Sequence, residues 1–235
     1  GATGMFAGCA APPPDWLRTK YGIDLRLEVA ETIEELRIAP LPPEHRGAAS
    51  TRLAEAARAL GYAVYPQPKF IRPERAPRFR CGAHCLLGCR CGAKWSAAEF
   101  VEEAVRAGAL LFPHAFVERV LLEGGRAVGV AGRIRGQPFI ARADRVVLAA
   151  GGLGTPRILQ ASGFRGIGEG LAMDLTVIVY GRSRADGNAS DPPMTWSWED
   201  PGLEVMFSTL MDPWLLYPLV AGMSGLRHVA TWPRW

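Results

Sequence analysis

The sequence predicts a mixed α/β fold, and three observations support this prediction. Apolar residues make up 49% of the 235 residues and charged residues 21%, a balance that allows a sizeable buried core. Segments with helical periodicity alternate with short apolar segments in the middle of the chain. One of the apolar segments, at 146–150, leads directly into a glycine-rich turn and a helix, which is the order found in sheets of parallel strands.

The first half of the chain is expected to be helical and then irregular. Before residue 63 the helical segments are 15–22, 30–38 and 49–62. Asp15 is placed to cap the first of them, and Gly22 and Gly61 stand where a helix ends in a left-handed residue. Residues 63–95 combine prolines with a group of cysteines and show no period, so an irregular segment is expected there.

The second half is expected to be more regular. A helix is expected at 96–109, because Ser96 and Glu99 form a capping box. Strands are expected at 109–112, 138–143, 145–150 and 175–181, with two more inside 116–134 around a turn at 123–126. A last helix is expected at 155–163, with Thr155 as its cap.

Charge and hydropathy argue against two classes of partner. The net charge is only +4, and the arginines are scattered rather than gathered into a basic stripe with interleaved aromatic residues. Nucleic-acid binding is therefore not expected. No apolar run reaches the about 18 residues that span a bilayer, so no membrane span is expected either.

The turn after the apolar strand is a candidate ligand site. It lies where the carboxyl end of a central strand would bind a ligand in an open α/β sheet. Gly151, Gly152 and Gly154 would let a ligand approach the main chain, and the helix start would offer free N–H groups to an anion. The alternative is a tight turn from strand to helix that holds no ligand.

The order of these segments resembles that of the glucose–methanol–choline (GMC) flavoprotein oxidoreductases. The resemblance rests on VVLAAGGLGTPRILQASG (146–163), AEFVEEAVRAGALLFPHAFVERVLLEGGRAVGV before it, CGAHCLLGCRCGAKWSA, and GATGMFAGCAAPPPDWLRTKYGIDL at the start. In that family the first segment lies against FAD, a valine of the preceding hairpin meets the adenine, and a glycine loop lies near the flavin. The cofactor-binding residues implied by the resemblance are Gly1, Thr3, Val117, Ala150, Gly151, Gly152 and Thr155.

The resemblance also implies a division of the chain: part of a Rossmann-like FAD-binding domain, followed by the start of an antiparallel-sheet substrate domain. Residues 1–30 would form the glycine loop near the flavin with a short helix, 31–95 an irregular and helical insert with the cysteine cluster, 96–175 part of the FAD-binding domain, and 176–235 the start of the substrate domain.

Two parts of such an enzyme are missing from the sequence. No G-x-G-x-x-G follows an opening strand, and the glycines at 166–170 follow a helix instead. The family's C-terminal segment with the catalytic histidine is also absent, which leaves His228 as a weak candidate for the base. The chain is therefore expected to be a central portion or a split subunit, completed by a protein chain that carries the missing flavin and catalytic segments.

The cysteines allow several interpretations. Cys81, Cys85, Cys89 and Cys91 are spaced C-x3-C-x3-C-x-C, which is not the pattern of a zinc ribbon. They are structural cysteines, reduced or paired as disulfides, or the ligands of an iron–sulfur cluster or of zinc.

The expected function is oxidation of an alcohol or sugar CH–OH group, with hydride transfer to FAD. A non-catalytic assembly subunit that retains half of a flavoprotein fold, and an iron–sulfur electron-transfer module, are the alternatives.

Overall fold

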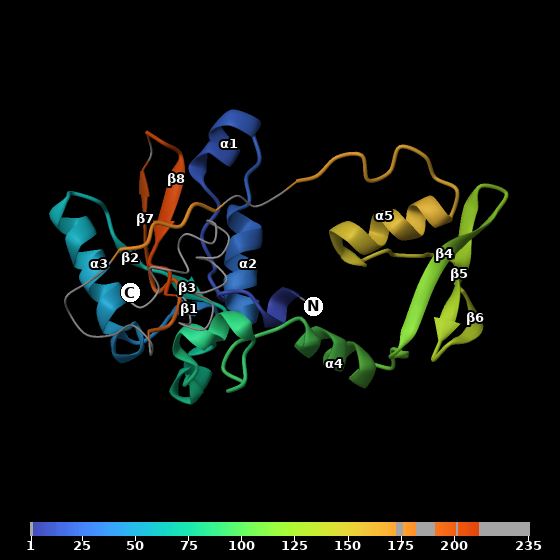
Figure 1. Cartoon of the computed structure of the whole chain (residues 1–235), viewed down its shortest axis with the longest axis horizontal. Helices are drawn as coiled ribbons and strands as arrows, with labels where there is room; N and C mark the ends of the chain where they lie inside the picture. Colours follow the sequence, from blue (N-terminus) through green and yellow to red (C-terminus); the bar gives the residue numbers. More distant parts are fainter. Residues whose placement is uncertain (1, 173–175, 182–190, 201, 212–235) are drawn as a thin grey trace, which may run out of the picture. The chain divides into compact units, whose positions relative to one another are not determined.

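The computed structural model describes residues 2–172, 176–181, 191–200 and 202–211. It divides the chain into two compact units, one of Gly1–Glu102 with Ile178–Trp235 and the other of Glu103–Val177. Helices and small antiparallel sheets make up both, so the mixed α/β fold is confirmed (Figure 1). In these ranges no helix combines the length and the apolar character needed to cross a membrane.

The first unit combines helices with two small sheets. Its helices are α1 (Asp15–Tyr21), α2 (Arg26–Leu36), α3 (Ala48–Ala59) and α4 (Ala98–Arg106), the last of which continues into the second unit, and 3₁₀ turns occupy Ala2–Gly4, Pro43–His45, Pro73–Arg78 and Gly82–Leu87. Its strands are β1 (Ala39–Pro40), β2 (Tyr65–Pro66), β3 (Pro68–Lys69), β7 (Trp196–Asp200) and β8 (Val205–Ser208). β1 pairs with β3, and the other sheet has the order β2–β7–β8, all antiparallel.

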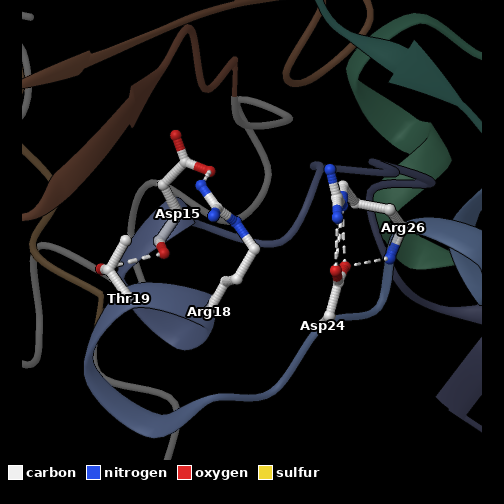
Figure 2. Close-up of polar contacts among 5 residues, drawn as sticks. All are labelled: Asp15, Arg18, Thr19, Asp24 and Arg26. Carbon is white, nitrogen blue, oxygen red and sulfur yellow. Dashed lines mark hydrogen bonds and ion pairs between the residues drawn. The ribbon is translucent and has the colours of Figure 1, made fainter.

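Figure 2 shows polar contacts within α1 and at the start of α2. Gly22 ends α1 with φ 67°, as expected, whereas Asp15 is the first helical residue rather than the cap. Asp24 accepts the Arg26 main-chain N–H at 3.1 Å and three side-chain hydrogen bonds from the same arginine. Those side-chain bonds, followed by the main-chain bond, lower the pKa of Asp24 to about 2.

A carboxylate distant in sequence caps α3. Asp191 accepts the main-chain N–H of Ser50 at 2.9 Å, in the first turn of the helix, and both residues are buried. Gly47 precedes the helix with φ 84°, and a Cβ at that position would overlap the Asp191 carboxylate. The sequence therefore uses glycine here both for the backbone conformation and for space.

Two clusters of buried residues form the core of the first unit. One contains Leu41, Ile71, Ala76, Phe79, Cys85 and Ala93, and the other contains Leu36, Ile38 and Trp95. Trp196 of β7 is also buried, outside these two clusters. The guanidinium groups of Arg46 and Arg58 lie over its ring, 4.9 and 4.7 Å from the ring centre. The segment 63–95 is thus irregular, as expected, yet it supplies much of the core.

The second unit is an antiparallel meander with one helix against it (Figure 1). It consists of β4 (Ala115–Glu123), β5 (Arg126–Ile134), β6 (Gln137–Arg142) and α5 (Gly151–Ala161). The expected hairpin turn is confirmed, because Gly124 and Gly125 both have positive φ, 56° and 78°. At the end of α5 the Ser162 hydroxyl accepts the Val120 N–H at 2.8 Å and so joins the helix to β4.

Three expected strands do not form. Residues 109–112, 145–150 and the described part of 175–181 have no strand hydrogen bonds. A parallel strand exists only where a neighbour pairs with it, and all strand pairs among the described residues are antiparallel. These segments are apolar, as the sequence shows. Whether an apolar segment forms a strand depends on a neighbouring segment that pairs with it.

Candidate functional site

The second unit holds an open pocket of about 910 Å³. Its walls come from the start of β4, from β5 and β6, from the extended segment 145–150 and from α5. Many of the lining residues are small, so main-chain atoms are accessible from the pocket. The volume lies within the ~300–1,000 Å³ typical of ligand sites.

The glycine corner borders this pocket and is open. Nothing lies within 4 Å of a Cβ built on Gly151 or Gly152, and both residues are exposed. Ala150 and Gly154, on either side of them, line the pocket. At Gly151 and Gly152 the corner is therefore not filled by neighbouring side chains, which leaves the main chain there available to a ligand, whereas a Cβ at Gly154 would lie 2.9 Å from that of Ala150.

The start of α5 differs from expectation. The helix begins at Gly151 rather than after Thr155, so Thr155 is not its cap. The Thr155 hydroxyl instead accepts the main-chain N–H of Ala150 at 3.1 Å. Because glycine needs no side-chain space and Gly151 adopts φ 77°, the chain turns into the helix five residues earlier than the Thr-Pro pattern indicated.

The structure brings some of the expected cofactor residues together. Val117 and Ala150 line the same pocket, and Gly151, Gly152 and Thr155 lie beside it without lining it.

The other expected residues lie elsewhere. Thr3 belongs to the first unit, where its hydroxyl accepts the Ala97 N–H at 3.1 Å. Gly1 and His228 lie outside the described residues.

Sequence analysis missed two cations that line the pocket, Arg145 and Arg157. Both are exposed, and neither guanidinium has a hydrogen bond or ion pair with another residue that the structure describes. The sequence offered one signal for each of them. Arg145 directly precedes the apolar segment 146–150, and Arg157 is the last residue of the Thr-Pro-Arg motif. They give the pocket two positive charges suited to an anionic ligand. Glu118 also lines the pocket, and its carboxylate forms an ion pair with Arg133 at 3.1 Å.

The cysteine cluster forms part of the core. Cys85 is buried, Cys81 and Cys91 pack against the same cluster, and the Sγ atoms of Cys89 and Cys91 are 3.7 Å apart. Burial raises the pKa of the Cys85 thiol, against the opposing charges of Lys94 and Lys69.

No metal site is evident at these thiols. Within the described ranges no three Cys, His, Asp or Glu side chains are arranged to hold a metal ion. The cysteines are free thiols, and their positions give the iron–sulfur and zinc interpretations no support.

Comparison with known proteins agrees with the family resemblance found in the sequence. A family model described as GMC oxidoreductase matches residues 19–176. Two relatives from two strains of Mycobacterium tuberculosis, each described as an uncharacterized GMC-type oxidoreductase, are 37% identical to this chain over 177 residues. Each match covers 70% of this chain and 27% of the relative, so the chain spans about a quarter of the length of these curated relatives.

Proposed function

Because the chain belongs to the GMC oxidoreductase family, we propose that it forms part of the FAD site of an enzyme that oxidises an alcohol or sugar CH–OH group. The family binds FAD in general, and bound FAD supplies the acceptor for the hydride that leaves the substrate carbon. The observation that supports the proposal is the open pocket at the glycine corner, which the expected residues Val117 and Ala150 line together.

The residues of the pocket suit this cofactor. Small side chains along the wall allow a flat ring system to lie on the main chain, as at Ala150 and Gly154. Arg145 and Arg157 place positive charge on the same pocket, which suits a cofactor that carries a pyrophosphate. We assign to this unit the binding and orientation of the cofactor, and no proton transfer.

A complementary polypeptide is part of the same proposal. The apolar segment 145–150 has no strand partner among the described residues, and Val147 is 88% exposed there. The sequence contains no G-x-G-x-x-G after a strand to hold the pyrophosphate. We propose that residues outside this chain supply both the pairing strands and the catalytic base.

The test fills the pocket without disturbing the protein around it. In Ala150→Leu a larger side chain enters the pocket wall, and we expect the affinity for FAD, measured by quenching of flavin fluorescence, to fall at least about tenfold. Ala104→Leu is the matched control, because Ala104 is an exposed position of α4 that lies outside the pocket, and its affinity should equal that of the wild type. Equal affinity in both variants, or no FAD binding by the full protein, would contradict the proposal.

A further inference from the structure

The chain has three lysines, and two of them are buried. Lys69 is 1% exposed and Lys94 is 5% exposed, whereas Lys20 lies on the surface in an ion pair with Glu204. No Asp or Glu among the described residues forms an ion pair with either buried lysine. A buried ammonium group is costly unless hydrogen bonds replace its hydration, so its partners carry information.

Main-chain oxygens replace the water around Lys69. Its ammonium group donates to the carbonyl oxygens of Ala7 at 2.6 Å, Pro193 at 2.8 Å and Met194 at 3.4 Å. One side chain thus joins three segments of the first unit: the N-terminal segment, β3 and the residues directly before β7.

Lys94 holds the neighbouring part of the N-terminal segment. Its ammonium group donates to the carbonyl oxygens of Phe6 and of Cys85, the latter at 3.2 Å, and lies 4.7 Å from the centre of the Phe6 ring. Gly8 has φ 72°, and a Cβ there would lie 3.0 Å from the Lys94 side chain. The lysines and the N-terminal segment are therefore closely packed.

The segment that these lysines hold forms a wall of a second pocket. Residues 8–10 pair with 68–70 through Phe70 N–H to Gly8 O at 2.8 Å and Ala10 N–H to Pro68 O at 2.9 Å. Cys9, Ala10, Pro68 and Phe70 then line an apolar pocket of about 450 Å³ against α2.

We propose that Lys69 and Lys94 are positioning residues, whose buried side-chain amino groups donate hydrogen bonds that hold the main chain of residues 6–10 in place. The same segment continues back to Thr3, so the two lysines also set the position of the loop expected near the flavin. This second part rests on the proposed function, whereas the first part rests only on the hydrogen bonds of the two lysines.

The pH dependence of the segment gives a readout that packing alone would not produce. Burial lowers the pKa of Lys69 to about 8, although Cys9 and Cys85 oppose the shift and Lys94 adds to it. When residues 6–10 open, Lys69 regains water and its usual pKa, so above about pH 8 the open state binds more protons than the closed state. A rise in pH through this range therefore stabilises the closed state, because the neutral amine of Lys69 keeps N–H donors for the main-chain oxygens and no longer carries the cost of burying a charge. Burial raises the pKa of the Cys9 and Cys85 thiols, which gives the opposite trend above about pH 9.

The experiment measures amide hydrogen exchange of peptides covering 6–10 and 68–70 in the full protein, corrected for the intrinsic rate. For the wild type we expect protection to increase up to about tenfold between roughly pH 8 and 9. In Lys69→Met the increase should disappear, and in Lys94→Met the protection at neutral pH should fall at least about tenfold. Lys20→Met should behave as the wild type.

Several outcomes distinguish the positioning role of the two lysines from its link to the flavin. Unchanged exchange in both variants, or protection in the wild type that falls between roughly pH 8 and 9, would overturn the positioning role. If Lys69→Met does not fold, the pH dependence of exchange in the wild type and the exchange of Lys94→Met still test the positioning role. In the FAD titration, Lys69→Met should bind at least about fivefold more weakly than Lys20→Met. Altered exchange with unaltered FAD affinity would overturn the link to the flavin, whereas absence of FAD binding in the wild type would contradict the proposed function and leave the exchange result standing.

Discussion

At the scale of single residues, the glycines of this chain serve different physical purposes. A Cβ on Gly132 would overlap the Phe116 carbonyl oxygen of the adjacent strand, whereas nothing lies within 4 Å of a Cβ on Gly152. The first glycine is required by the protein's own packing. The second leaves free space beside a pocket, which is why we connect it with a ligand. The sequence alone does not show whether a glycine is required by packing, as at Gly132, or leaves open space, as at Gly152.

Gly132→Ala should destabilise the second unit. The added methyl group would push β4 and β5 apart, and we expect a loss of about 2 kcal/mol or more in the free energy of unfolding, measured by urea titration. Gly170→Ala is the control, because nothing lies within 4 Å of a Cβ at Gly170 and its φ is not in the left-handed region, so its midpoint should not move. Equal midpoints for the two variants would mean that the strands can separate without cost.

At the scale of elements, the start of α3 depends on a residue that is far away in sequence. The Asp191 carboxylate accepts the Ser50 N–H, which no local capping residue satisfies. Local patterns predicted this helix and its left-handed end at Gly61, where φ is 91°. They could not predict its cap, because the cap is a tertiary contact.

Asp191→Ala should therefore weaken α3. Loss of the buried cap should lower the free energy of unfolding by about 1–2 kcal/mol, observed as a lower thermal midpoint in circular dichroism. Asp191→Asn keeps an acceptor oxygen and should lose less. Asp144→Ala, at an exposed position, should leave the midpoint unchanged; a similar loss in this control would rule out the capping explanation.

Element prediction from sequence succeeded where the signal was local. The α1 end at Gly22 and the hairpin of β4 and β5 follow from turn chemistry, and the expected helix at 96–109 contains α4. Prediction failed at 145–150, which needs a neighbouring strand. An antiparallel sheet was expected within 176–235, but the individual strands β7 and β8 were not assigned. β7 pairs with β8 and with β2, and β2 is more than a hundred residues away in the sequence, a distance that no local pattern reports.

At the scale of the whole molecule, exposed apolar side chains gather in unpaired segments of the second unit. Leu110, Phe112 and Val147 are 82%, 62% and 88% exposed. Such surfaces in soluble proteins mark contacts with another polypeptide. The sequence predicted the apolar segments. The family resemblance named Val117 and Ala150, which line the pocket, but it did not name Arg145 and Arg157, whose relevance comes only from where the chain places them.

Val147→Lys should reduce self-association of the isolated chain. An unpaired apolar segment tends to pair with another copy, so we expect concentration-dependent association of the wild type in analytical ultracentrifugation and less of it in the variant. Leu60→Lys is the matched control, since Leu60 is 78% exposed in the first unit and outside the unpaired segments. A monomeric wild type, or an equal effect of both changes, would argue against an exposed pairing surface.

The contacts of Lys69 have a consequence for which substitutions this protein can tolerate during evolution. The ammonium group recognises peptide oxygens, which every amino acid offers, rather than any particular neighbouring side chain. Substitution can therefore proceed at a position such as Ala7 without a compensating change elsewhere, while the lysine itself has no substitute of equal length and donor number. The tolerance of the N-terminal segment and the intolerance of Lys69 would then be two results of the same set of hydrogen bonds.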